Sequence, residues 1–165
     1  MMYQKLQALL PQFTVEPVTP ENLSLYETVF YNNQEYYCLT DGHPATKETC
    51  EDSIDGYLDY PTYSIGICHN KQAVAFLSVL DGYPEEGTLY IGLLLVDDRF
   101  QHLAIGSSII QALFKVATDL NFKNLQLSVQ ENNISGLSFW KKIGFYEIDR
   151  CPCEGFDNLS MKYDL

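Results

Sequence analysis

Apolar residues recur along the chain in seven short runs with the length and composition of β-strands. The second and third runs flank the turn His69-Asn70-Lys71, which predicts a β-hairpin. The fourth run ends in four successive apolar residues, Leu93 to Val96, and this predicts burial on both faces. The predicted strands are Gln12–Val18, Tyr63–Cys68, Ala73–Leu80, Thr88–Val96, Leu125–Val129, Phe145–Arg150 and Leu159–Tyr163.

Four other segments space their apolar residues three and four positions apart, as one face of an α-helix requires. The first begins with Thr19 as N-cap and Pro20 at the first position, and it continues through Tyr37 to the break at Gly42. The last is closed by Gly144. The apolar positions of the first helix are Leu23, Tyr26, Phe30 and Tyr37, those of the second are Cys50, Ile54, Tyr57 and Leu58, and the other two helices are Ile105–Leu120 and Asn133–Lys142.

The order of these elements, βααβββαβαββ, predicts an α/β fold of the mixed α+β kind. We expect a central mixed, largely antiparallel sheet of about seven strands with four helices on both faces. No internal repeat, low-complexity stretch or Gly/Ser/Pro-rich linker interrupts the chain. Residues 1–165 are therefore expected to form a single domain.

Charge narrows the range of partners. The net charge is −12, and residues 1–86 hold 13 acidic against 3 basic residues. Such a surface repels nucleic acid, so a nucleic-acid-binding role is disfavoured. No apolar run approaches the ~18 residues of a transmembrane helix, and the first residues do not resemble a signal peptide. We therefore expect no membrane partner and a cytoplasmic location.

The five cysteines are odd in number and scattered, which favours reduced thiols. Cys151-Pro152-Cys153 is the single close pair, and no second pair completes a zinc site. The sequence therefore predicts no metal, and it places these two thiols in a loop between the last two strands.

The segment from Val96 to Ser107 is typical of an anion-binding loop. It leads from a strand directly into a long helix, whose first-turn N–H groups lack intrahelical partners and lie at the positive end of the helix dipole. The small residues Ala104 and Gly106 let a phosphate approach those amides closely. Neither GxxxxGK[ST] nor GxGxxG occurs, so the loop is neither a P-loop nor a dinucleotide fingerprint.

Two motifs in this half of the chain resemble the GNAT superfamily of N-acetyltransferases. The acetyl-CoA signature of that family, Arg/Gln-x-x-Gly-x-Gly/Ala, is similar to Gln101-x-x-Ala104-x-Gly106, with Val96 and Phe100 at the expected offsets before it. Residues 133–145 are similar to the family helix Asn-x-x-Ala-x-x-Phe-Tyr-x-Lys-x-Gly-Phe, with Gly136 and Trp140 in place of alanine and tyrosine. The resemblance implies the GNAT fold and an enzyme that transfers an acetyl group from acetyl-CoA to an amine.

The resemblance also implies which residues bind the cofactor. Backbone groups of Leu94, Leu95 and Val96 would pair with the pantetheine arm, amides of Gln101, His102, Leu103, Ala104, Ile105, Gly106 and Ser107 would bind the pyrophosphate, and Asn133 and Trp140 would lie near the arm. From the residues alone, Gln101 and His102 equally suit a solvated loop, and Asn133 equally suits a helix N-cap. Ala104 replaces a glycine, which is conservative if its φ is negative and damaging if its backbone is left-handed.

The usual catalytic positions of the family are changed in this chain. A primary amine with a pKa near ~10.4 is mostly protonated at neutral pH, and supplying it as the free base costs about 4.6 kcal/mol. The position of the family's glutamate base holds Tyr90, and that of its tyrosine acid holds Trp140, whose indole is no proton donor for a thiolate. Tyr90 is therefore the candidate acid or water-orienting group, with a packed strand tyrosine as the alternative.

The acceptor amine should bind the N-terminal half, where the family builds its substrate wall. Carboxylates interleaved with tyrosines suit a cationic amine, and a solvated acidic surface with core tyrosines is the alternative. The predicted acceptor residues are Tyr31, Asn32, Glu35 and Tyr36, within a region that also holds Asn33, Tyr37, Asp41 and His43.

Two functions stay open at this stage. The first is an acetyltransferase for a cationic small molecule, a lysine side chain or an N-terminal amine, with a homodimer as the assembly that the family suggests. The second is a GNAT-fold module that binds acyl-CoA as a sensor or structural ligand without turnover, because both usual catalytic positions are substituted.

Overall fold

The computed structural model describes residues 1–56 and 59–165, and these form a seven-stranded sheet in the order β1-β2-β3-β4-β5-β7-β6. Only the pair β4–β5 is parallel; all other neighbours are antiparallel, which confirms the predicted mixed, largely antiparallel sheet. The strands are β1 (Thr14–Pro17), β2 (Thr62–His69), β3 (Gln72–Asp81), β4 (Thr88–Val96), β5 (Asn124–Gln130), β6 (Tyr146–Cys153) and β7 (Phe156–Asp164).

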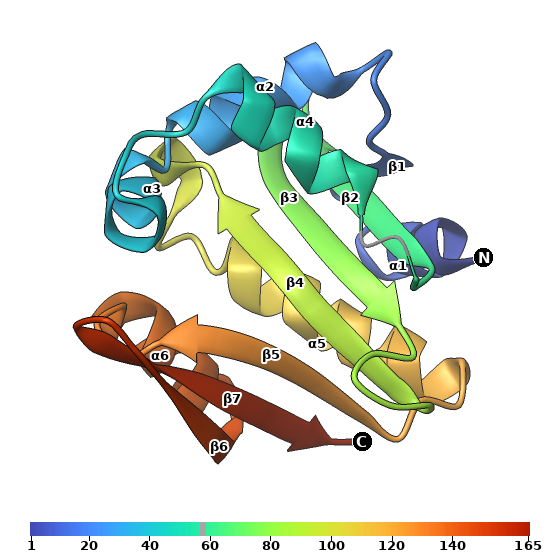
Figure 1. Cartoon of the computed structure of the whole chain (residues 1–165). Helices are drawn as coiled ribbons and strands as arrows, with labels where there is room; N and C mark the ends of the chain where they lie inside the picture. The colour runs from blue at the N-terminus through green and yellow to red at the C-terminus, as the bar shows by residue number, and fades with distance from the viewer. Residues whose placement is uncertain (57–58) are drawn as a thin grey trace.

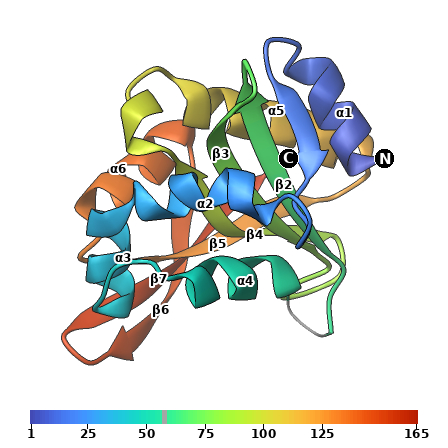
Figure 2. The same ribbon diagram turned by 90° about the horizontal axis from the view of Figure 1, so that it is seen from above.

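Helices cover both faces of the sheet, as predicted (Figures 1 and 2). One face carries α2, α3 and α4, and the other carries α1, α5 and α6. The helices are α1 (Met2–Leu9), α2 (Leu23–Tyr31), α3 (Gln34–Asp41), α4 (Lys47–Asp55), α5 (Ile105–Asp119) and α6 (Ile134–Ile143), and a short 3-10 turn, η1 (Asp98–Phe100), precedes α5.

The described residues thus form six α-helices instead of the four that were predicted, and the difference has two sources. Helix α1 was missed, although Met2, Leu6 and Leu10 are buried at a spacing of four residues. The helix predicted from Pro20 to Tyr37 is two helices, because the chain breaks at Asn32 and Asn33. Of the apolar positions predicted for the second helix, Cys50 and Ile54 lie in or against the core of this face, whereas Tyr57 and Leu58 lie outside the described residues.

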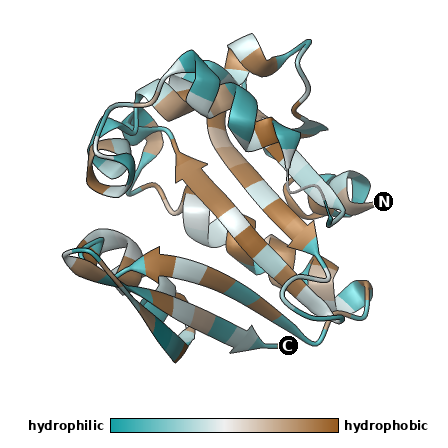
Figure 3. Ribbon diagram, in the orientation of Figure 1, coloured by the Kyte–Doolittle hydropathy of each residue, from teal (hydrophilic) through white to brown (hydrophobic). Residues whose placement is uncertain are grey.

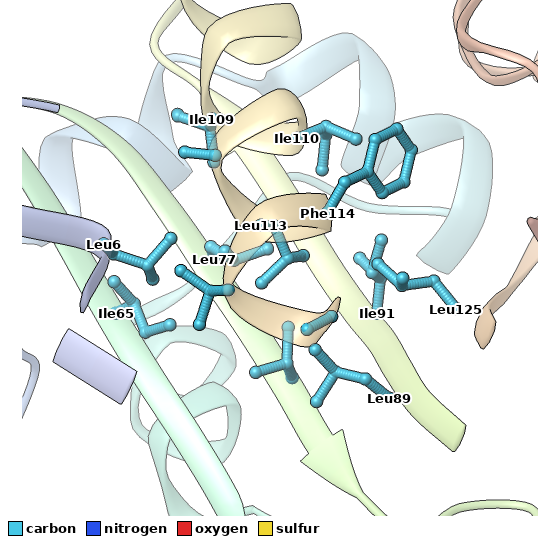
Figure 4. Close-up of a cluster of buried hydrophobic side chains, with 14 of the residues drawn as sticks. Leu6, Ile65, Leu77, Leu89, Ile91, Ile109, Ile110, Leu113, Phe114 and Leu125 are labelled. Atoms are coloured by element: carbon cyan, nitrogen blue, oxygen red, sulfur yellow. The ribbon is translucent and has the colours of Figure 1, made fainter. Parts of the chain in front are cut away.

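Two hydrophobic clusters, one on each side of the sheet, form the core. The larger packs α5 and α1 onto β2–β5, where Leu113 lies beside Leu77 (Figure 4). The smaller packs α2–α4 onto β3 and β4 around Tyr26, Phe30 and Phe76. Strands β3 and β4 are mostly hydrophobic along their length (Figure 3), since both of their faces bear helices. Each fully buried large side chain contributes roughly 1.5–3 kcal/mol.

The hairpins differ in how well the sequence predicted them. Asn70 and Lys71 both have positive φ (50° and 62°), as a two-residue type I′ turn requires between β2 and β3, so that hairpin is confirmed. The loop predicted around Cys151 and Cys153 was wrong. Both cysteines belong to β6, which pairs with β7 up to Cys153↔Phe156, and the turn consists of Glu154 and Gly155, the latter with φ of 82°.

Candidate functional site

Strands β4 and β5 pair along only part of their length. Their register joins Thr88–Ile91 to Asn124–Leu127, and beyond Ile91 the two strands part, as Figure 1 shows. A register irregularity lies at the same point, because Ser78 faces Leu93 while Val79 faces Ile91, which leaves Gly92 as the extra residue of a β-bulge. A bulge bends its strand and increases the local twist. The sheet therefore opens where β4 continues past Gly92.

The hydrogen-bond alternation of β4 decides which backbone groups face this opening. The N–H of Asp97 donates to the Val74 carbonyl (2.9 Å), so these two residues form a hydrogen-bonded pair. Hydrogen-bonded and non-hydrogen-bonded pairs alternate along an antiparallel ladder. Leu94 and Val96 are therefore in non-hydrogen-bonded pairs, and their backbone N–H and C=O groups point away from β3. The resemblance implied cofactor pairing by Leu94, Leu95 and Val96. The structure turns the backbone groups of Leu94 and Val96 toward the opening and those of Leu95 toward β3.

The opening also corrects the prediction that residues 93–96 are buried on both faces. Leu95 is buried, whereas Leu93, Leu94 and Val96 are only partly so. The physical reason is that β3 pairs with one edge of this part of β4, whereas no described strand pairs with the edge that faces β5, so that edge and part of each face stay accessible.

Six consecutive backbone N–H groups, from His102 to Ser107, donate no hydrogen bond within the part of the chain that the structure describes. The first amide of this helix to find a partner is that of Ser108, which donates to the Ala104 carbonyl (3.0 Å). Three of the six belong to the first turn of α5 and three to the loop before it. Such a set of free donors at a helix N-terminus is suited to bind a phosphate group. Gln101 differs, because its N–H donates to the Asp98 carbonyl at 3.4 Å.

The path of this loop depends on two residues in the left-handed region. His102 has φ of 62° and Ala104, at the N-cap of α5, has φ of 61°. Alanine in place of the family's glycine at position 104 is therefore unfavourable, because a left-handed backbone costs a residue with a Cβ roughly 1–2 kcal/mol. Gly106 is needed for packing, since a Cβ there would lie 3.3 Å from the Phe139 ring of α6.

A buried carboxylate holds the start of the loop. Asp97 is fully buried and accepts hydrogen bonds from the backbone N–H of Arg99 (3.0 Å), from the Arg99 guanidinium (2.9 Å to each oxygen) and from Asn32 Nδ2 (3.0 Å). Burial acts to raise the pKa of Asp97, but the hydrogen bonds from Arg99 and Asn32 outweigh it, and the pKa is lowered. Asp97 is therefore ionised at neutral pH and fixes the turn before the free amides.

The predicted residues of α6 and β4 have structural contacts of their own. Asn133 caps α6 by accepting from the Gly136 N–H (3.1 Å). Trp140 is buried in the larger core cluster, with its ring packed edge-on against Phe145. Tyr90 is partly buried on β4 before the bulge, and its ring meets that of Tyr83 edge-on at 4.8 Å.

A cavity of about 490 Å³ lies on the opposite side of β4 from α5. Its floor is formed by Ser78, Gly92 and Leu93, at the point where β4 bends away from β5. The walls come from α3, α4, the chain between them and the C-cap of α4: Tyr37, Asp41, His43, Thr46, Glu48, Thr49, Asp52, Ser53 and Gly56. Cavities of this size suit small organic ligands.

The cavity is acidic and carries an unpartnered hydroxyl. Asp41, Glu48 and Asp52 form no ion pair with any described residue. The Tyr37 hydroxyl is buried and has no hydrogen-bond partner among the described residues. Burial, chiefly, raises the pKa of Tyr37, which keeps the phenol protonated. A hydroxyl without a partner at the wall of a cavity is a place for a polar ligand group.

The four residues predicted for the acceptor, Tyr31, Asn32, Glu35 and Tyr36, do not line this cavity. Tyr37, Asp41 and His43 of the same region do, while His43 also uses Nδ1 in a 2.8 Å hydrogen bond with the Pro44 carbonyl. Sequence reasoning missed Glu48 and Asp52. Their signal was the spacing of four residues, which places both carboxylates on one face of a helix.

Two further findings bear on the class of protein. No group of His, Cys, Asp or Glu side chains among residues 1–56 and 59–165 has the arrangement of a metal site. None of the described helices combines the length and apolar character that crossing a bilayer requires.

Comparisons with known proteins find relatives among acetyltransferases. A spermine/spermidine N(1)-acetyltransferase of Bacillus subtilis (strain 168) is 25% identical over 107 residues, which cover 61% of this chain and 68% of that protein. An acetyltransferase structure from Thermus thermophilus matches with a TM-score of 0.77 at 22% identity, over 93% of this chain and 97% of that one. The PaiA N-acetyltransferase from Thermoplasma acidophilum, solved in complex with coenzyme A, matches with a TM-score of 0.67 at 17% identity, over 93% and 99%.

The sequence pattern of one protein family matches most of the chain. That family, described as the acetyltransferase (GNAT) family, matches residues 23–145, which run from α2 through α6 and contain both motifs and the free amides. The chain belongs to the acetyltransferase (GNAT) family.

Proposed function

We propose that this chain transfers an acetyl group from acetyl-CoA to a primary amine of a small acceptor with at least two cationic centres, such as a polyamine. The observation that carries the proposal is the acidic cavity, whose three unpaired carboxylates and free phenol lie beside the bend of β4. The similarity to a spermine/spermidine N(1)-acetyltransferase supports the same class of acceptor.

The residues present suit the cofactor. The free N–H groups from His102 to Ser107 would hold its pyrophosphate, and at the open edge of β4 the backbone of Leu94 and the N–H of Val96 would pair with the amide groups of its arm. When bound, acetyl-CoA supplies a thioester carbonyl that a neutral amine can attack. The protein would hold this carbonyl in line with the amine, and such positioning alone can supply ~7–11 kcal/mol of the barrier.

The electrostatics of the cavity argue for two amines rather than one. A carboxylate beside an ammonium group stabilises the charged form, whereas the reacting amine must be neutral. Asp41, Glu48 and Asp52 are therefore suited to hold a distant ammonium group of the acceptor. The reacting amine would lie nearer the floor at Gly92 and Leu93, where the protonated Tyr37 hydroxyl can donate or accept one hydrogen bond.

The test is free-thiol release from acetyl-CoA with spermidine as acceptor, for the wild type and for the double variant Glu48→Gln/Asp52→Asn. We expect the KM for spermidine to rise about tenfold or more, equivalent to ~1.4 kcal/mol, because the ammonium group loses its charged partners. The matched control is Glu51→Gln on the same helix, since Glu51 pairs with Lys47 (3.9 Å) outside the cavity. An unchanged KM in the double variant would contradict the assignment of the cavity.

A second candidate, an acyl-CoA-binding module without turnover, is favoured by one observation. The position of the family's tyrosine acid holds Trp140, which is buried in the core, and no carboxylate replaces the family's base at Tyr90. Tight binding of acetyl-CoA with no thiol release across polyamines, aminoglycosides and lysine peptides would support this candidate and exclude the first.

A further inference from the structure

The junction between α2 and α3 is hydrogen-bonded to the end of β4, although the two lie more than 60 residues apart in the chain. The junction consists of Asn32, the C-cap of α2, and Asn33, the N-cap position of α3. The start of α3 does not explain Asn33, because its side chain makes no capping bond to that helix. Both side chains are directed instead toward β4 and the loop that follows it.

Asn33 uses its whole amide in this connection. Nδ2 donates to the Val29 carbonyl in α2 (2.7 Å) and to the Val96 carbonyl at the end of β4 (3.0 Å). Oδ1 accepts from Gln101 Nε2 (3.2 Å), which also donates to the Val96 carbonyl (2.9 Å). The Val96 carbonyl belongs to the open edge of β4, and Gln101 begins the loop of free amides. Asn33 thus contacts both parts of the proposed cofactor site.

Asn32 makes a parallel connection through a buried charge. Its Nδ2 donates to Asp97 Oδ2 (3.0 Å), and Asp97 in turn holds Arg99 at the start of the same loop. Hydrogen bonds to charged groups are roughly twice as strong as neutral ones, so this link is the stiffer of the two.

On its other side, Asn33 fixes the first turn of α3. Its carbonyl accepts from the Tyr37 N–H (3.1 Å), and Tyr37 and Asp41, which follow one and two turns later, both line the acidic cavity. A shift of Asn33 would therefore move two wall residues of the cavity together, because a helix turn transmits displacement as a rigid unit.

We propose that Asn33 is a positioning residue that couples the cofactor loop to the acceptor cavity, so that binding of the cofactor orders α3 and its wall residues. Asn32 supports the same coupling through Asp97. This inference rests on the proposed function, since it takes the loop as the cofactor site and the cavity as the acceptor site. Coupling between two such sites is typically 5–150-fold.

The experiment is hydrogen–deuterium exchange of the full chain with and without coenzyme A, which needs neither an acceptor nor turnover. In the wild type, coenzyme A should slow amide exchange both in the loop 101–107 and in α3 (Gln34–Asp41), the latter by about fivefold. In Asn33→Ala the loop should still be protected, while α3 should change by less than about twofold. The matched control is Gln34→Ala, which loses a bond to the Tyr31 carbonyl (2.7 Å) in the same junction, whereas the Gln34 side chain makes no hydrogen bond to β4 in the described structure.

Each outcome separates this inference from the proposed function. If coenzyme A protects the loop but not α3 in the wild type, or protects α3 equally in Asn33→Ala, the coupling is refuted and the cofactor site stands. If coenzyme A neither binds nor protects the loop, the proposed function fails and the inference fails with it. Should Asn33→Ala not fold, as judged by thermal unfolding, Asn33→Asp keeps the size of the side chain and removes both donors.

Discussion

Ala104 shows how the loop before α5 combines an unfavourable backbone with a position in the proposed cofactor site. Its φ of 61° is a conformation in which a Cβ is costly, yet the same turn exposes the six free amides. His102, with φ of 62°, adds a second such residue two positions earlier. Strain of this kind persists only where the surrounding structure fixes the backbone. Here the Asp97–Arg99 ion pair fixes the chain before the loop, and α5 fixes the chain after it.

At this scale the prediction is that Ala104→Gly stabilises the chain. Relief of the left-handed strain, roughly 1–2 kcal/mol, exceeds the loss of about 0.4–1 kcal/mol from greater freedom of the unfolded chain. The free energy of unfolding, measured with urea, should therefore rise by about 0.5 kcal/mol. Ala112→Gly, inside α5, serves as the control and should lower it by about 1 kcal/mol. A lower stability in Ala104→Gly would contradict the left-handed assignment.

At the scale of elements, the N-cap of α6 packs closely against a glycine. A Cβ at Gly136 would lie 2.5 Å from Asn133 Nδ2, because the Asn133 side chain folds over the first turn to cap it. In this chain the observed position of the cap therefore requires a residue without a Cβ at 136.

The corresponding prediction is that the effect of Gly136→Ala on the unfolding free energy changes sign when Asn133 is replaced by alanine. In the wild type, Gly136→Ala should cost about 1 kcal/mol of unfolding free energy, because it displaces the cap. In the Asn133→Ala background the same change should stabilise the protein by up to about 1 kcal/mol, since alanine is the better helix former. Urea unfolding of all four proteins measures this coupling, and additive costs would show that the cap does not contact Gly136 in solution.

Particular elements show what the sequence could and could not predict. Strand β4 and helix α5 were both predicted from strong local hydrophobic patterns, to which Ile109 and Leu113 contribute in α5, and both were confirmed. The break between α2 and α3 was missed because its cause is remote: Asn32 and Asn33 bond to β4, more than 60 residues away. The extension of β6 through Cys153 was missed for the same reason, since pairing with β7 overrides Pro152 on an edge strand.

One part of the candidate site could likewise be predicted from the sequence, and another part could not. The free amides from His102 to Ser107 could be predicted, because a strand, a loop and a helix N-terminus follow one another in the sequence. The walls of the acidic cavity could not, because Tyr37, Glu48 and Gly92 come from three separate segments that only the fold brings together. Periodicity could indicate that Glu48 and Asp52 share a helix face, but it could not indicate what that face would meet.

At the scale of the whole molecule, the net charge of −12 acts on the two proposed substrates with opposite signs. Most of the excess lies in residues 1–86, which include α3 and α4 around the cavity. A polyamine is attracted over a distance set by the Debye length, about 30 Å at 0.01 M salt and 10 Å at 0.1 M, while the phosphates of the proposed cofactor are repelled.

We therefore predict opposite salt dependences. Between about 0.01 and 0.1 M salt, the KM for spermidine should rise several-fold and the KM for acetyl-CoA should stay constant or fall, because screening weakens attraction and repulsion alike. Initial rates of thiol release at several salt concentrations measure both values. The double variant Glu48→Gln/Asp52→Asn should show a smaller rise for spermidine. A parallel increase of both KM values would show that the charge of the molecule does not steer its substrates.

The parting of β4 from β5 gives the sheet a gap where one further strand would belong. A sheet edge at the rim of a protein accepts almost any extended chain, and for that reason it favours aggregation. This edge lies in the interior of the sheet, between β4 and β5, so it admits only a guest that is narrow, extended and carries amide groups at the spacing of a peptide. Recognition of the proposed cofactor there would depend on the backbone of Leu94 and the N–H of Val96, which would make the gap largely indifferent to which apolar side chains those two residues carry.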